Sequence, residues 1–144
     1  MGINEVISRR LERIEESISR LREAGKITKQ EFLTDWKYQD ATIRNFQVAI
    51  EACLDMGSYL IALSGWKSPE GYTKIVEILG EKGVLPKDFI EKAKDMVKFR
   101  NIIVHDYLYI DLNKVYSNLK QIDDLRQFAR YIVEFIESSQ KECV

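Results

Sequence analysis

Apolar residues recur every three or four positions along most of the chain, and this spacing favours helices over any other regular structure. Only two prolines and seven glycines interrupt 144 residues, and nearly all of them stand at the edges of the periodic segments. No segment shows the polar–apolar alternation that is typical of a strand. The pattern therefore predicts an all-α protein. The first helical face consists of Ile3, Val6, Ile7, Leu11, Ile14, Ile18 and Leu21.

Start and stop signals divide the chain into about five helices. A capping box opens the second helix, because Thr28 and Glu31 can each bond the backbone amide of the other. Since the connections are short, we expect a mostly antiparallel five-helix bundle in a single domain, residues 1–144. The other predicted boundaries are Gly25 after the first helix, Gly65 after the second, Ser68-Pro69-Glu70 and Gly80 for the third, Pro86 and Asp88 for the fourth, and Asp111 for the fifth.

Composition narrows the class of protein. Hydrophobic residues make up 45% of the chain and charged residues 31%, which is typical of soluble globular proteins. The net charge is −1, so binding of nucleic acid would have to rely on a local basic patch. The longest apolar run, residues 59–63, is far shorter than the roughly 20 residues that span a bilayer. We expect a cytoplasmic protein with no membrane partner.

Histidine and cysteine are scarce. The chain has one histidine and two cysteines and contains no C-x-x-C pair, so it cannot assemble a Cys/His zinc site on its own. We expect neither a metal nor a cofactor. Cys53 lies within an apolar run, and we expect it to be a small core residue rather than a reactive thiol.

The single histidine lies in the segment Arg100-Asn101-Ile102-Ile103-Val104-His105-Asp106-Tyr107. On a helix, Asn101 and His105 share a face, and the long side chain of Arg100 can reach that face. An arginine can hold a phosphodiester through two parallel hydrogen bonds, and a histidine can transfer a proton near neutral pH. The segment is therefore the candidate catalytic site.

These side chains suit RNA cleavage by internal transesterification, which requires no metal. Arg100 would stabilise charge on the phosphate, Asn101 would orient the imidazole or a phosphate oxygen, and His105 would transfer a proton. The reaction works best with one base and one acid, so we expect a two-fold homodimer to bring a second histidine to the cleft. A structural histidine near a helix end is the alternative, because an R-x4-H spacing alone is a weak signal.

Apolar and aromatic side chains near the motif are expected to belong to the core. Ile102, Ile103 and Val104 mostly turn away from the polar face, so we expect them to pack inward. Three further aromatic residues have the right chemistry to stack on bases, but we expect core packing for each of them: Trp36, Trp66 and Tyr109.

The segment from Arg100 to Tyr107, with Ile110-Asp111 after it, resembles the R-N-x-x-V-H-x-Y…I-D signature of the HepT-like toxins. These toxins are α-helical ribonucleases of the HEPN superfamily. Residues 45–55 are similar to the second helix of that family, and the five-helix layout also fits. The resemblance covers most of the chain and implies an HEPN-like fold.

The resemblance implies a metal-independent endoribonuclease, active as a homodimer, that is the toxin of a type VII toxin–antitoxin system. Arg100, Asn101 and His105 match the catalytic motif of the family. The implied partner is a cognate minimal nucleotidyltransferase antitoxin, and Tyr107 matches the tyrosine to which it adds AMP from ATP. An added AMP would place phosphate charge two residues from His105. A tyrosine that caps the bundle is the alternative for Tyr107.

Two other interpretations remain open. One is a non-catalytic helical subunit that presents substrate or nucleotide to a nucleotidyltransferase. The other is a purely structural bundle, which would bury Arg100 and His105 against each other. Glu51 and Asp55 lie four residues apart on one helical face, where they either orient Arg100 or remain solvated. The sequence does not specify which RNA is cut.

Overall fold

The chain folds into a bundle of helices, as the apolar periodicity predicts. The computed structural model describes residues 3–142, with the side chains of residues 5–139, and no strand occurs in that range. In chain order the elements, with η for a short 3-10 helix, are α1 (Ile3–Ala24), α2 (Lys29–Thr34), α3 (Trp36–Leu63), α4 (Tyr72–Glu81), α5 (Lys87–His105), η1 (Tyr107–Tyr109), α6 (Leu112–Asn118), η2 (Leu119–Gln121) and α7 (Asp123–Glu142). The predicted all-α class is confirmed.

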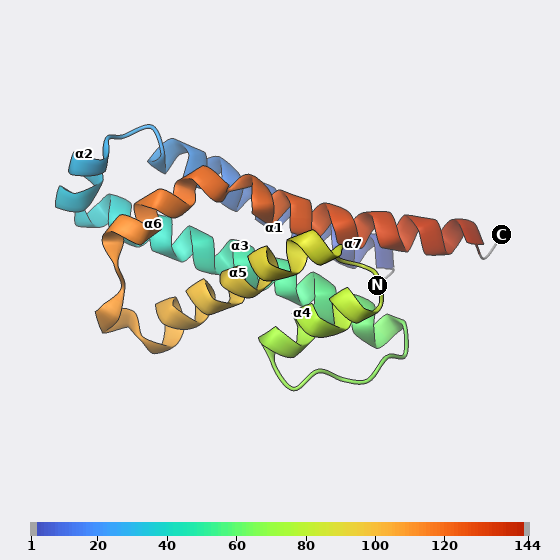
Figure 1. The fold of residues 1–144 in the computed structure, drawn as a ribbon. Helices are drawn as coiled ribbons and strands as arrows, with labels where there is room; N and C mark the ends of the chain where they lie inside the picture. Colours follow the sequence, from blue (N-terminus) through green and yellow to red (C-terminus); the bar gives the residue numbers. More distant parts are fainter. Residues whose placement is uncertain (1–2, 143–144) are drawn as a thin grey trace.

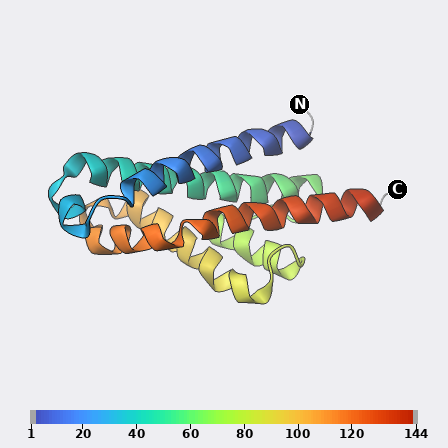
Figure 2. The same ribbon diagram turned by 90° about the horizontal axis from the view of Figure 1, so that it is seen from above.

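α3 is the central helix of the bundle, and α1, α4, α5 and α7 all pack against it. Figure 1 shows α1 and α7 lying beside each other along one side of the molecule, with α4 and α5 on another side of α3. α1 and α5 run antiparallel to α3. Figure 2 shows that the start of α1 and the end of α7 lie at the same end of the bundle, opposite α2 and α6.

The composition of α3 follows from its central position. An 18-residue window in this helix has a mean hydropathy of 1.3, so length and composition alone would allow it to cross a membrane. No uninterrupted apolar run reveals this property, because a few polar residues divide the apolar ones. In the bundle, 56% of that window is buried, as is typical of a core helix. Its buried residues include Phe46, Ile50, Leu54 and Ile61.

The predicted capping box opens α2. Glu31 N donates to Thr28 Oγ1 at 3.1 Å, and the Glu31 carboxylate accepts from the Thr28 backbone amide at 3.4 Å. The prediction of a single second helix that runs towards Gly65 with a bend is only partly correct, because α2 ends at Thr34 and α3 begins at Trp36. Asp35 has an extended backbone, and its carboxylate accepts from Lys37 N at 3.0 Å to cap α3. The sequence prediction missed this cap because apolar spacing continues across it.

Two other predicted boundaries need correction. The third helix begins at Tyr72 and not at Ser68-Pro69-Glu70, because Gly71 before it has φ 150°, a conformation that favours glycine and that a helix cannot include. The predicted fifth helix begins as expected, since Asp111 accepts from Asn113 N at 3.0 Å. It is then interrupted by η2, so α6 and α7 are separate helices.

Gly57, inside α3, lets α3 and α4 approach closely. A Cβ atom at this position would lie 2.9 Å from Cγ2 of Ile75 and 2.9 Å from Cδ1 of Leu79. Both neighbours are buried, so neither side chain moves aside freely. The packing of α4 against α3 therefore depends on the absence of a side chain at Gly57.

We expect Gly57→Ala to lower the free energy of unfolding by up to about 2 kcal/mol, because an overpacking cost of about 1–3 kcal/mol outweighs the gain of about 1 kcal/mol in helix propensity. Urea unfolding monitored by circular dichroism measures the change. Gly25→Ala is the matched control, since its Cβ would lie at ordinary contact distances of 3.5 and 3.6 Å from backbone oxygens. Equal stabilities of the two variants would contradict the prediction.

Candidate active site

The predicted motif occupies the C-terminal part of α5, which packs against α3 and α4. The Arg100 side chain lies between these helices and is only 16% exposed. Its Nη2 donates to Oε2 of Glu51 on α3 at 3.5 Å, and its Cζ lies 4.7 Å from the centre of the Tyr72 ring on α4. A carboxylate and an aromatic face both attract a cation, so these contacts hold the guanidinium in place.

Arg100 keeps part of its hydrogen-bonding capacity free. Its Nη1 donates to Oδ1 of Asn101 at 3.3 Å, whereas its Nε is buried and has no hydrogen-bond partner among the described residues. A buried donor without a partner costs about 1–3 kcal/mol. Such an unsatisfied group in a native fold calls for a specific explanation, and a ligand oxygen is one candidate.

His105 is the last residue of α5, and its side chain is exposed. Arg100 and Asn101 are bonded to each other, but among the described hydrogen bonds none joins either of them to His105. The structure thus brings two residues of the predicted trio together and leaves the imidazole at the surface. Arg100 and His105 are not buried against each other, so the geometry does not favour the purely structural interpretation.

The residues after His105 form the exposed turn η1. Tyr107 is 62% exposed, and its phenol is therefore open to a modifying enzyme rather than wedged into the bundle. Tyr109 is 83% exposed, so the expectation that it packs in the core is wrong. None of the three residues of η1 is buried.

The expectation that Ile102, Ile103 and Val104 all pack inward is only partly correct. Ile103 is buried, whereas Ile102 and Val104 remain exposed on either side of it. Helical spacing shows that these three residues point in different directions, but the faces that neighbouring helices cover depend on the tertiary arrangement. The exposed pair leaves an apolar surface beside His105.

The two carboxylates of α3 have different surroundings. Glu51 contacts Arg100 and also accepts from Gln47 Nε2 at 3.0 Å, so it orients the guanidinium. Asp55 instead faces Arg10 on α1 at 4.0 Å. Partial burial raises the pKa of Asp55, Arg10 lowers it by a smaller amount, and the nearby Glu51 carboxylate raises it further.

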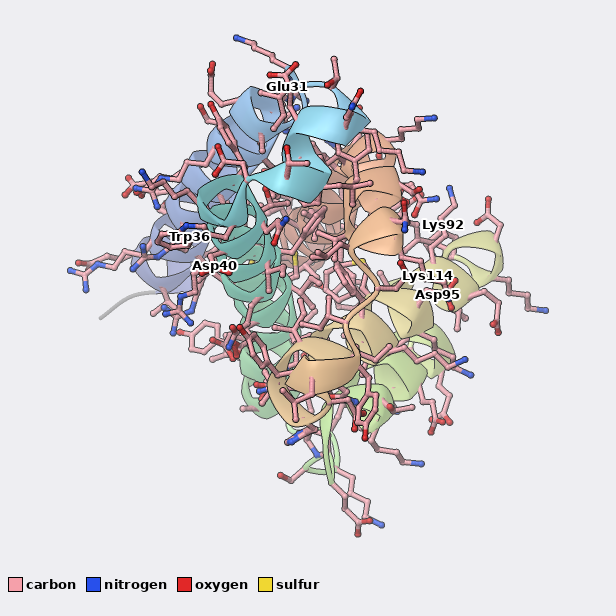
Figure 3. The ribbon with its side chains drawn as sticks, turned by 90° about the vertical axis from the view of Figure 1, so that its left-hand side faces the viewer. Glu31, Trp36, Asp40, Lys92, Asp95 and Lys114 are labelled. Carbon is pink, nitrogen blue, oxygen red and sulfur yellow. The ribbon has the colours of Figure 1, made fainter. Side chains whose placement is uncertain are left out.

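The sequence did not predict the contact of Tyr72 with Arg100, and the expected burial of Trp36 is wrong. Tyr72 lies in no motif, and only the tertiary packing of α4 places its ring at Arg100. Trp36 is 67% exposed at the start of α3, where Figure 3 shows it away from the core, so its predicted burial is wrong. Trp66 packs against Phe135 with ring centres 5.9 Å apart, as expected for a core contact.

Cys53 is fully buried, as predicted, and burial strongly raises the pKa of its thiol. Its Sγ donates to the carbonyl oxygen of Leu125 at 3.4 Å. A protonated thiol in the core is a poor nucleophile and a poor metal ligand. Among the described side chains, no group of three histidine, cysteine, aspartate or glutamate residues is placed to hold a metal ion. The absence of a metal in the reaction stays a prediction.

Sequence comparison assigns the chain to a family. The model of the HepT-like ribonucleases matches residues 14–132, and the chain therefore belongs to the HepT-like ribonuclease family. It is 27% identical over 127 residues to a Shewanella oneidensis protein named mRNA nuclease HepT, covering 88% of this chain and 95% of that protein. It is 26% identical over 128 residues to the tRNA nuclease HepT of Aphanizomenon flos-aquae, covering 88% and 85%.

Solved structures agree with this assignment. The tri-AMPylated Shewanella oneidensis HEPN toxin, solved in complex with an MNT antitoxin, superimposes with a TM-score of 0.83 at 25% identity, covering 93% of this chain and 99% of that chain. The cytosolic protein YutE of Bacillus subtilis gives a TM-score of 0.78 at 23% identity, covering 95% and 92%. The predicted HEPN-like fold is confirmed, and membership of the family confirms the predicted endoribonuclease class. The roles of individual site residues stay predictions.

The raised pKa of Asp55 leads to a prediction about stability. A carboxylate whose pKa is higher in the folded state than in the unfolded chain reduces stability as pH rises through that interval, which begins near the unfolded value of about 3.9. Asp55→Asn removes this loss, so we expect the stability of the variant relative to the wild type to increase as pH rises above about 4.

Urea unfolding at several pH values tests this expectation. Asp40→Asn removes the same charge from an exposed position on α3 and serves as the control. A stability difference between Asp55→Asn and the wild type that stays constant, or declines with rising pH, would show that the assigned cause is wrong.

Proposed function

We propose that this protein is an endoribonuclease toxin that cleaves RNA without a metal ion, at a site shared by two copies of the chain. The observation that carries the proposal is the combination of Arg100, a fixed and largely buried cation, with His105, an exposed imidazole, in one helical motif. The first can bind and stabilise a phosphate, and the second can exchange protons with solvent and substrate. Membership of the HepT-like ribonuclease family supports this assignment.

The proposed reaction is an internal transesterification. The 2′-oxygen of a ribose attacks the adjacent phosphorus, the bond from phosphorus to the 5′-oxygen breaks, and the products end in a 2′,3′-cyclic phosphate and a 5′-hydroxyl. A neutral His105 accepts the proton of the 2′-hydroxyl, and a protonated His105 of the partner subunit donates a proton to the leaving oxygen. Arg100 stabilises the charge that develops on the non-bridging oxygens.

Three residues contact the Arg100 guanidinium and support this reaction by positioning it: Glu51, Tyr72 and Asn101. Glu51 and Tyr72 approach the guanidinium from different helices, and Asn101 accepts from it within α5. The partnerless Nε of Arg100 is a donor that a phosphate oxygen can satisfy. A cation that is already fixed loses little conformational freedom when the substrate binds.

The homodimer follows from the single histidine and from the surface around it. Ile102, Val104 and Leu108 expose apolar side chains near His105. A second copy that covers this surface would bury it and bring the second imidazole into the same cleft, because a two-fold axis applies the same patch to both subunits.

Regulation of the proposed toxin centres on Tyr107. A minimal nucleotidyltransferase antitoxin would join the phenolic oxygen of Tyr107 to the α-phosphorus of ATP, with release of pyrophosphate. The exposed phenol supports this role, as does the AMPylated state of the similar Shewanella oneidensis toxin in complex with its MNT antitoxin. The added phosphate would repel RNA from the adjacent cleft. We place this type VII toxin–antitoxin pair in the cytoplasm, where the YutE relative is described.

We expect purified protein to cleave RNA in the presence of EDTA and to leave 2′,3′-cyclic phosphate ends. His105→Ala should reduce the rate by about 10²–10⁴-fold, because it removes the proton donor and acceptor, and Arg100→Ala should also abolish most of the activity. Gel analysis of labelled RNA measures both effects. Lys98→Ala, an exposed position on the same helix, is the control.

Cleavage that persists unchanged in both site variants would refute the site assignment. A wild-type protein that binds a nucleotidyltransferase in a nucleotide-dependent manner, yet cuts no RNA, would instead support the alternative of a non-catalytic partner subunit.

We expect co-expression with an MNT-type nucleotidyltransferase from the same genome to raise the intact mass by one or more AMP units. Tyr107→Phe should abolish the increment because it removes the accepting oxygen, whereas Tyr109→Phe, at a more exposed tyrosine two residues away, should retain it. Intact-mass spectrometry distinguishes the two. A mass increment that survives in Tyr107→Phe and disappears in Tyr109→Phe would contradict the prediction, because it would show that Tyr109 is the modified residue.

A further inference from the structure

Four arginines line a groove between α1 and α3, although the overall charge of the protein is nearly balanced. Arg9, Arg10 and Arg13 come from α1, Arg44 comes from α3, and the groove has a volume of about 350 Å³. Figure 3 shows nitrogen-tipped side chains that project from this edge of the molecule. The net charge of −1 means that such a concentration of cations is local rather than a result of composition.

The arginines of this groove, called the arginine groove from here on, are poorly neutralised by the protein itself. Arg9 pairs with Glu5 on its own helix at 3.3 Å, and Arg10 approaches Asp55 only to 4.0 Å. Arg13 and Arg44 form no ion pair among the described side chains, and both are exposed. Like charges one helical turn apart destabilise a helix slightly, so this arrangement favours an anionic ligand.

The arginine groove and the candidate active site have one residue in common, Glu51. The carboxylate of Glu51 lines the groove and also accepts the hydrogen bond from Arg100. The arginine groove therefore borders a residue that contacts Arg100. This shared residue links the groove to the site of the proposed nuclease.

We propose that the arginine groove binds the phosphodiester backbone of RNA next to the bond that is cleaved. The inference rests on the proposed function and names a part of the substrate outside the catalytic motif. Arginine forks match phosphate oxygens in geometry and charge, so they would hold the strand without reading its bases. Contacts of this kind make affinity strongly dependent on salt.

The chemistry of the lining favours RNA over an acidic protein. A protein interface usually contains an apolar core surrounded by polar residues. In the arginine groove the apolar contribution is limited to the small side chains of Val48 and Ala52, with no aromatic anchor. A flexible polyanion needs no such core, because its phosphates supply the binding energy.

The test measures RNA binding in a His105→Ala background, so that the substrate stays intact. The groove variant Arg13→Gln/Arg44→Gln removes two of the proposed phosphate contacts, while Arg20→Gln/Arg130→Gln removes the same charge at exposed positions outside the groove. Fluorescence anisotropy of a labelled single-stranded RNA of about 20 nucleotides gives the binding constant at several salt concentrations. Arg13→Lys/Arg44→Lys keeps the charge.

We expect the slope of log K against log salt for RNA binding to be smaller in magnitude by about 1.4 in the groove variant. The variant lacks two phosphate contacts, and each contact to a single strand contributes about 0.7 to the slope. That change corresponds to about 25-fold weaker binding near 0.1 M salt. The control variant and the lysine variant should keep a slope close to that of the His105→Ala protein. With His105 intact, the groove variant should show a higher KM and an unchanged kcat.

The outcomes separate this inference from the proposed function. Weaker RNA binding by the groove variant supports binding of the RNA backbone in the arginine groove, whereas a wild type that cleaves no RNA contradicts only the proposed function. An affinity and slope equal to those of the control would overturn the inference, even if the nuclease activity is confirmed. Unchanged RNA binding with loss of binding to the nucleotidyltransferase would assign the arginines to a protein interface and would also overturn it.

Discussion

The buried position of Arg100 is the constraint on which the candidate site depends. A guanidinium largely removed from water is unfavourable unless other groups compensate it. Here the compensation comes from two different helices, through the carboxylate of Glu51 on α3 and the ring of Tyr72 on α4. The packing of these helices against α5 therefore sets the position of the cation, and the bundle as a whole acts as the support of the site.

Arg100 and His105 differ in how far the protein encloses their side chains. Arg100 is enclosed, whereas His105, five residues later, ends the helix and faces solvent. A phosphate-binding group benefits from a fixed position, because disorder would reduce its electrostatic effect. A proton-transfer group must reach substrate and exchange with water. One helix supplies both properties because its middle is packed and its end is free.

Local sequence rules predicted part of this structure. The capping box of Thr28 and the cap at Asp111 depend on neighbours within three residues, and both were predictable. The break at Asp35 was missed, since the apolar spacing continues through it.

The site was predictable in its residues and not in its arrangement. The motif from Arg100 to Tyr107 identified the segment. The contact between Arg100 and Tyr72 joins residues far apart in the chain, and rules of residue spacing do not predict such contacts. The exposure of Ile102 and Val104 was missed for the same reason. Periodicity tells which residues share a face, whereas the covering of each face depends on how the helices assemble.

The turn that carries Tyr107 has few backbone hydrogen bonds. Its backbone bonds run from Tyr109 N to the Asp106 oxygen at 2.8 Å and from Ile110 N to the Tyr107 oxygen at 3.4 Å. Segments with so few protected bonds open at a small fraction of the free energy that unfolds the whole protein. This turn can therefore open locally while the packed part of α5 that carries Arg100 keeps its structure.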